Sequence, residues 1–352
     1  MLRGLRNDGI ITKELERYMT MKTVTAGKLK GNPKVHKPSR CMRTIVSTVN
    51  HPIEGVAKVA EEELRKGVER LPSYVKDTTH FLNSLRLVNQ PLPPDTLLFT
   101  MDVRGLYPNV PRAEAREACR KSLDRRTNPT IPTERVLQMI DLVLENSNFR
   151  FGDQNYTQTE GTAIGSKPGM HYASTYMGEW ESELLERAQK RPTQYYRFVD
   201  DIFGIWPHGE QSLRDFCEVA NAIYPRIKLT MECSKESITF LDTRVRLHNG
   251  MIKTGLYTKP TDRHLYLHSK SDHPEKMKKA IPYGLGIRLK RICSDTESYV
   301  RNRKALKEQL YRRGYKKSEV ETQLRKVDRL DREDLLNMVR LGGQGKIGYH
   351  WF

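Results

Sequence analysis

The chain has 352 residues, and its 61 lysines and arginines outnumber its 43 aspartates and glutamates, giving a formal net charge of +18. Such a charge favours a polyanionic partner, nucleic acid first and an anionic membrane surface second; a charge that only maintains solubility is the alternative. No apolar run approaches the roughly 20 residues of a membrane-spanning helix, and the first 20 residues lack the apolar core of a signal peptide. The five cysteines are scattered without a CxxC pair, which indicates a reducing compartment and argues against a disulfide framework.

The predicted elements alternate between helices and strands over most of the chain. A short helical lead precedes a Pro-rich basic segment at 31–40, which predicts a loop or extended chain, and a β-branched strand at 43–49. Periodic apolar residues predict helices over 52–70, 109–123, 133–146, 171–188 and 211–222. Apolar and alternating runs predict strands over 96–103, 226–232, 237–247 and 251–257, and a hairpin over 148–158.

The last third of the chain has a different composition from the rest. From about Arg288 to Arg340 the pattern is helical, with many lysines and arginines and with periodic leucines. These residues form either a solvated helix face or a helical module that lies along a phosphate backbone. We therefore divide the chain into a lead (1–30), an α/β body (31–262), a basic helical region (263–345) and a tail (346–352).

Two adjacent acids lie inside an aromatic and aliphatic run, YYRFVDDIFGIW, at residues 195–206. The pattern suits two strands that meet at a tight turn, with Asp200 and Asp201 at or beside its tip. Asp102 ends the apolar strand LLFTMD, and acids at the ends of two buried strands can converge. Three such carboxylates suit Mg²⁺ or Mn²⁺, whose charge would offset their mutual repulsion. The alternative is a solvated hairpin turn, because Asp favours turns.

The same motifs resemble those of reverse transcriptases, and in particular those of Penelope-like retroelements, a group allied to telomerase. FVDD between aromatic strands resembles the metal-binding hairpin, and FTMDVRGLYPNVP (99–111) resembles the other metal-binding strand. GTAIGSKPGMHYASTYMGEWE (161–181) is similar to the template-contacting loop and helix between them, and GNPKVHKP followed by RTIVST resembles the fingers segment. ITFLDTRV, GLYTKPTDRHLYLHSKSDHP and IPYGLGIRLKRICSD resemble the Penelope-like group, so the likeness runs from about residue 30 to 345.

The resemblance implies roles for individual residues at the metal and nucleotide sites. Asp102, Asp200 and Asp201 would be metal ligands, with Asp201 the weakest because strand alternation could turn it aside. Lys235, before the strand at 237–247, would be the acid that protonates the leaving pyrophosphate. Tyr107 would pack under the sugar and exclude a ribose 2′-hydroxyl, which favours dNTPs over rNTPs.

The remaining implied roles concern the triphosphate and the template. Arg43 would contact the incoming triphosphate, since a guanidinium suits phosphate oxygens, and Lys34 and Lys37 would help to hold the triphosphate or the template. Template and primer contacts would come from the small-residue loop that contains Gly161, Gly165 and Ser166.

The resemblance implies an α+β right-hand polymerase fold, with fingers, a palm built on an antiparallel sheet, and a helical thumb. The expected activity is RNA-directed DNA polymerisation, in which dNTPs are added to a primer 3′-hydroxyl with two Mg²⁺ ions. The expected partners are an RNA template, a DNA primer and dNTPs but no membrane, and the expected location is nuclear. The oligomeric state stays open.

Three alternatives stay open at this point. One is another polymerase, either telomerase-like or an RNA-templated RNA polymerase, and a second is a domesticated, non-catalytic RNA-binding protein. The third is a zinc-bearing module that uses His264, His268, His273 and Cys293, although no cysteine pair supports it.

Overall fold

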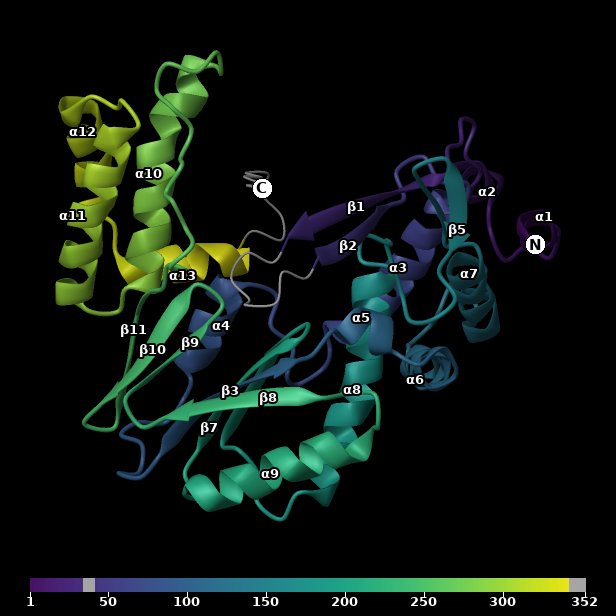
Figure 1. Ribbon diagram of the computed structural model, residues 1–352, viewed down its shortest axis with the longest axis horizontal. Coiled ribbons are helices and arrows are strands. Elements are labelled where there is room, and N and C mark those ends of the chain that lie inside the picture. The colour runs from purple at the N-terminus through teal and green to yellow at the C-terminus, as the bar shows by residue number, and fades with distance from the viewer. Residues whose placement is uncertain (34–41, 342–352) are drawn as a thin grey trace.

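Residues 1–33 and 42–341 are described by the structure, a computed structural model. The described chain forms three groups of elements (Figure 1): an N-terminal group of short helices and strands, a central sheet with helices beside it, and four C-terminal helices. No described helix combines the length and the apolar character needed to cross a membrane. Most of the predicted loop at 31–40, including Lys34 and Lys37, lies outside the described residues.

The N-terminal part of the chain is mainly helical. Thr12 caps the second helix by accepting a hydrogen bond from the amide of Leu15, and Asp77 caps α4 by accepting one from His80. The helices here are α1 (Leu2–Asn7), α2 (Lys13–Met19), α3 (Glu54–Val68) and α4 (Thr78–Leu85). A four-stranded sheet, ordered β2-β1-β4-β5, is formed by β1 (Gly27–Pro33), β2 (Met42–Ser47), β4 (Asn148–Phe151) and β5 (Gln154–Thr157). The lead therefore ends before residue 30, because β1 begins at Gly27.

The central sheet is entirely antiparallel, with the strand order β6-β7-β3-β8. Its strands are β3 (Leu97–Val103), β6 (Gln194–Phe198), β7 (Asp201–Trp206) and β8 (Leu229–Ser234). The hairpin predicted with Asp200 and Asp201 at or beside its tip is confirmed: β6 ends at Phe198, and Asp201 is the first residue of β7. Helices pack near this sheet: α5 (Leu106–Asn109), α6 (Arg112–Asp124), α7 (Thr133–Glu145), α8 (Gly169–Arg187) and α9 (Glu210–Ile223).

Alternating residues of the central strands belong to two different cores. Phe99, Met101 and Ile202 pack into the main core with helices α3 and α6–α9. Leu98 and Phe203 belong to a second core, with Phe81 of α4. Because side chains alternate along a strand, each face of the sheet has its own core.

A third sheet, ordered β11-β10-β9, contains β9 (Ser237–Phe240), β10 (Thr243–His248) and β11 (Met251–Leu256). The single strand predicted over 237–247 is wrong, because Leu241, at φ 55°, reverses the chain between β9 and β10.

The C-terminal helices are α10 (Glu275–Ile292), α11 (Thr296–Arg312), α12 (Lys317–Asp328) and α13 (Arg332–Leu341). They enclose a small core that includes Leu289, Leu310 and Leu324. The helical region begins well before residue 288, since α10 starts at Glu275. Pro282 and two glycines within α10 obscure the helical periodicity in the sequence, so the pattern is recognisable only from about residue 288 onward.

Candidate active site

One end of the two inner strands of the central sheet brings two of the predicted acids together. Asp102 of β3 and Asp201 of β7 are directly opposite one another in the antiparallel pairing. Asp102 lies an even number of residues from Leu98 along β3, and Asp201 lies an even number of residues from Phe203 along β7. Both acids therefore lie on the sheet face that carries Leu98 and Phe203. The expectation that strand alternation could turn Asp201 aside is therefore wrong: alternation places Asp201 beside Asp102.

Asp201 lies in an unfavourable electrostatic environment for a carboxylate. Burial, the Asp200 carboxylate and the Asp102 carboxylate together raise the pKa of Asp201 to about 6, and only the charge of Lys259 opposes them. The charges of Asp200 and Asp102 thus both act on Asp201 at the end of two strands, an arrangement that a bound cation would stabilise.

Asp200 occupies the turn between β6 and β7, with Val199 before it. The amide of Val103 donates a hydrogen bond to the Asp200 carbonyl over 3.0 Å, which ties the turn to the end of β3. Val199 has a φ of 57°, a conformation that a β-branched residue rarely adopts. Such strain persists only where the surroundings impose it, and it is common at functional sites.

The charge of Asp200 in this turn acts on Tyr107, the residue predicted to select the sugar. Burial, with help from Asp200, raises the pKa of Tyr107 to about 12, while the positive charge of Arg43 acts in the opposite direction. Tyr107 of α5 is therefore within electrostatic reach of Asp200, in the β6–β7 turn, and of Arg43 in β2. Arg43 is exposed and pairs with Asn32 across β1 and β2.

Two glycines pack the small-residue loop onto this group. Gly161 has a φ of 62°, and a Cβ there would lie 2.4 Å from the Tyr107 carbonyl oxygen. Gly165 has a φ of 105°, and a Cβ there would lie 2.4 Å from the Val46 carbonyl oxygen in β2. Any larger residue would separate the loop from α5 and β2. Ser166 closes the loop, since its amide donates to the Ala163 carbonyl over 3.1 Å.

Lys235 is not brought to the carboxylates. Asp102 pairs with Thr230 in β8, and Lys235 follows five positions later, about 17 Å along the strand direction. There it forms an exposed ion pair with Asp95 over 2.8 Å. Lys259, which the sequence interpretation did not single out, is the lysine whose charge acts on Asp201. Lys259 lies in the motif GLYTKPTDRHLYLHSKSDHP, but its position in the sequence does not connect it to the three acids.

The donor chemistry of the three acids fits a hard divalent cation, since carboxylate oxygens are the ligands that Mg²⁺ and Mn²⁺ prefer. Within the described residues, however, no three Asp, Glu, His or Cys side chains have their donor atoms gathered around one point. Asp102, Asp200 and Asp201 therefore have the donor chemistry for a divalent cation but do not form a ready three-ligand site among the described residues. The four candidate zinc ligands are not gathered either, and Cys293 is buried among the C-terminal helices, where Ser298 donates to it.

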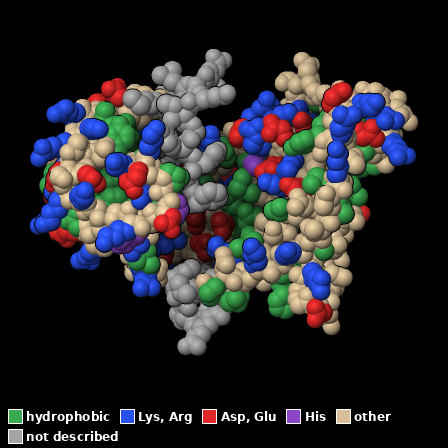
Figure 2. Space-filling view, turned by 90° about the horizontal axis from the view of Figure 1, so that it is seen from above, with side chains coloured by type: hydrophobic (Ala, Val, Ile, Leu, Met, Phe, Trp, Pro, Cys, Tyr) green, Lys and Arg blue, Asp and Glu red, His purple; other side chains and the backbone are tan. Residues whose placement is uncertain are grey.

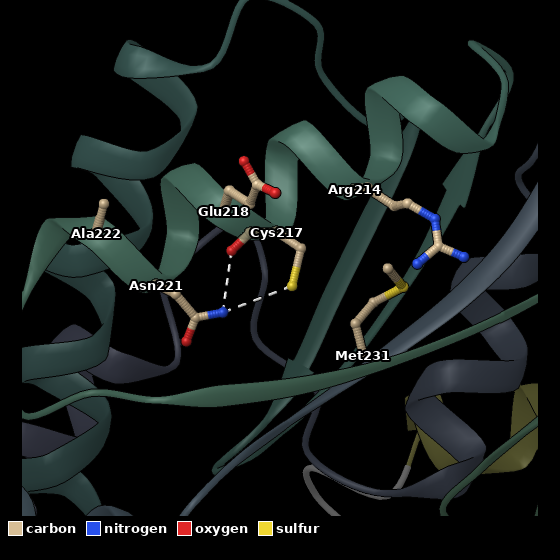
Figure 3. A pocket seen from close by; sticks show the side chains of 6 residues that line it. All are labelled: Arg214, Cys217, Glu218, Asn221, Ala222 and Met231. Atoms are coloured by element: carbon tan, nitrogen blue, oxygen red, sulfur yellow. Dashed lines mark hydrogen bonds between the residues drawn. The ribbon is translucent and has the colours of Figure 1, made fainter.

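The space-filling view shows a hollow between two lobes, with acidic side chains at its floor and many lysines and arginines on the lobes (Figure 2). A pocket of about 580 Å³ lies where the segment 257–266 meets α10 and α11, and its lining includes Lys259 and Arg288. A second pocket, of about 430 Å³, lies between α9 and β8 and is lined by Arg214, Cys217 and Met231 (Figure 3). Met231 packs into the main core, so this second pocket is on the opposite sheet face from Asp102.

Comparison with known proteins gives one partial family match. Residues 265–325, which include α10 and α11, match the family model described as an animal helix-turn-helix domain. No curated protein matches the chain.

Solved structures resemble the chain over most of its length. Telomerase from Candida albicans, solved with a fragment of telomeric RNA, matches with a TM-score of 0.58 at 12% identity, over 91% of this chain and 57% of that chain. Apo telomerase from Candida tropicalis matches with a TM-score of 0.54 at 12% identity, over 96% of this chain and 65% of that chain. The BmCPV RNA-dependent RNA polymerase matches with a TM-score of 0.51 at 14% identity, over 89% of this chain and 28% of that chain. At such identities the likeness concerns the fold alone, and the chain has a polymerase-like fold.

Proposed function

We propose that the chain is an RNA-directed DNA polymerase of the Penelope-like type, which extends a DNA primer on an RNA template. The observation that carries the proposal is the pairing of Asp102 with Asp201 across β3 and β7, with Asp200 in the adjoining turn. The polymerase-like fold supports this proposal. The sequence motifs quoted above support the narrower assignment to the Penelope-like type.

In this proposal Asp102, Asp200 and Asp201 would hold two Mg²⁺ ions, which would supply charge stabilisation for phosphoryl transfer. Arg43 contacts the triphosphate, since an exposed guanidinium close to Tyr107 can donate to phosphate oxygens. The Gly161–Gly165 loop positions the templating base beside α5, because both glycines allow close backbone approach there. The basic C-terminal helices contact the duplex backbone, so binding should weaken steeply as salt rises.

Primer extension tests the proposal directly. Purified protein, an RNA template annealed to a DNA primer, dNTPs and Mg²⁺ should give extension products, and Asp102→Asn should give none. Asp153→Asn is the matched control, since Asp153 is also an acid at a hairpin turn but is fully exposed on the β4–β5 hairpin. The proposal would be abandoned if Asp102→Asn extended primers as well as the unaltered protein.

Nucleotide choice separates the proposal from an RNA-synthesising polymerase. Tyr107 is held close to Asp200 and Gly161, where its ring can exclude a 2′-hydroxyl by sterics. Tyr107→Val should reduce the preference for dNTPs over rNTPs by about 10-fold or more, the discrimination expected of a steric contact worth a few kcal/mol. Competition assays with dCTP and CTP measure this ratio; preference for rNTPs in the unaltered protein would favour the RNA polymerase alternative.

A further inference from the structure

A buried ion pair lies directly behind the β6–β7 turn. Arg197 of β6 and Glu181 of α8 have side chains that are 3% and 7% exposed. The Arg197 Nε donates to one carboxylate oxygen of Glu181 over 2.6 Å, and the Arg197 Nη2 donates to the other over 3.1 Å. This two-point contact fixes the plane of the guanidinium as well as its position.

The remaining donors of the guanidinium contact two backbone carbonyls. Nη1 donates to the carbonyl of Val199 over 3.1 Å, and Nη2 donates to the carbonyl of Ser174 in α8 over 3.2 Å. Glu181 lies seven positions after Ser174, on the same face of α8. Arg197 therefore connects the helix that follows the small-residue loop to the turn that carries Asp200.

A third segment completes the network. The Ser73 hydroxyl donates to Glu181 over 2.7 Å, and the Ser73 carbonyl accepts a hydrogen bond from the Arg197 amide over 2.6 Å. The amide of Val75 donates to the Arg197 carbonyl over 3.0 Å. Both the backbone and the side chain of Arg197 are thus held, which leaves its guanidinium little freedom to move.

Stability alone does not account for this arrangement. A buried ion pair is often no more stabilising than well-packed apolar side chains of similar volume, because both charges must be desolvated. The contact with Val199 has a more specific consequence. The Val199 carbonyl belongs to the peptide bond that joins Val199 to Asp200, and Val199 is in a conformation that a β-branched residue rarely adopts. Holding that carbonyl sets the orientation of the peptide that leads into Asp200.

We propose that Arg197 and Glu181 are positioning residues that hold the Val199–Asp200 peptide and thereby set the Asp200 carboxylate relative to Asp102. The pair also makes this geometry depend on α8, which begins directly after the small-residue loop. The inference rests on the proposed function for its catalytic consequence, but the structural part of it can be tested without activity.

The main test is the double variant Arg197→Met/Glu181→Leu, which replaces both charges by apolar groups of similar reach. We expect a melting temperature close to that of the unaltered protein, because no buried charge is left unpaired. The Mg²⁺ concentration for half-maximal primer extension should rise about 10-fold or more, the change expected when a metal site loses a supporting contact. Hydrogen exchange in a peptide that spans residues 198–206 should become faster by about 10-fold.

The matched control is Arg126→Met/Glu63→Leu. Arg126 and Glu63 are a second ion pair with nearly buried side chains, 6% and 10% exposed, and they join α3 to the segment after α6 instead of contacting the hairpin. This control should alter neither the Mg²⁺ requirement nor the exchange of residues 198–206. The inference is wrong if the two double variants behave alike in both measurements, or if the first changes neither.

Two single variants keep the test decisive. Arg197→Lys retains the charge but cannot make the forked contact, so it should raise the Mg²⁺ requirement; an unchanged requirement would mean that charge alone matters. Glu181→Gln retains the shape of the side chain and serves if the double variant fails to fold, with the same expected increase in local exchange. If the unaltered protein extends no primer, the proposed function fails, and hydrogen exchange alone then decides the role of Arg197.

Discussion

Glu181 is a buried carboxylate and Asp201 a half-buried one, and both lie beside the β6–β7 hairpin, yet their surroundings are opposite. Glu181 receives two hydrogen bonds from Arg197 and one from Ser73. Asp201 has Asp200 and Asp102 as its strongest charged neighbours, and both repel it. The difference shows where this chain uses a buried charge to fix geometry and where it accumulates repulsion that an outside cation can relieve.

Loss of a carboxylate on the repelling side should affect catalysis most. Asp200→Ala should reduce primer extension by at least about 10³-fold, because a lost metal ligand removes several kcal/mol of transition-state stabilisation. Its melting temperature should stay the same or rise, since a repelling charge is removed. Steady-state extension assays and thermal unfolding measure the two quantities; a large loss of stability with partly retained extension would assign Asp200 to the structure instead.

The second largest effect is on stability, and it concerns Glu181. Arg197→Met alone should lower the free energy of unfolding by about 3–5 kcal/mol, because Glu181 would be left buried without its cation. Denaturant unfolding measures this loss, with Arg187→Met as the control for an exposed arginine on α8. Equal stability of the two variants would show that Glu181 does not depend on Arg197, and the contrast with Asp201 would disappear.

Asp201→Asn should have the opposite effect on the free energy of unfolding and stabilise the protein. Asp201 has a pKa of about 6 in the folded protein against an ordinary value of 3.8, so its ionised form destabilises the fold above pH 6. Without divalent metal, the variant should be more stable by about 1–2 kcal/mol at pH 7, allowing for partial exposure.

This gain should shrink as the pH falls through 6 and should vanish below about pH 4, where the carboxyl is protonated in both states. Denaturant unfolding in EDTA at a series of pH values tests the sign. A destabilised variant at pH 7 would mean that Asp201 makes favourable contacts that outweigh its repulsion.

The smallest effect concerns the lysine that the structure separates from the acids. Lys235→Ala should change the extension rate by less than about twofold and leave the melting temperature unchanged, because its partner Asp95 is also exposed. Lys259→Ala provides the comparison, and we expect its effect on extension to be the larger of the two. A loss of 100-fold or more in Lys235→Ala would show that the chain rearranges to bring this lysine to the site.

Local sequence pattern was sufficient for much of the site. The alternation in YYRFV and IFGIW predicted the hairpin with Asp200 and Asp201 at its tip, and the apolar run ending at Asp102 predicted the partner strand. Both patterns depend only on the two-residue period of a strand. The same period could not give the register between β3 and β7, so it could not show that Asp201 lies opposite Asp102.

The long-range contacts needed the tertiary structure. Arg197 precedes FVDD in the sequence, but its partner Glu181 is 16 residues earlier on a helix, and no local pattern connects the two. Lys235 follows β8 in the sequence, as a motif comparison would place it, yet the antiparallel pairing puts it at the far end of the sheet. Local pattern identified which residues carry charge and which strands hold them. Only the packing of sheet, turn and α8 decided which charges meet, because pairing register and helix placement depend on contacts between distant segments.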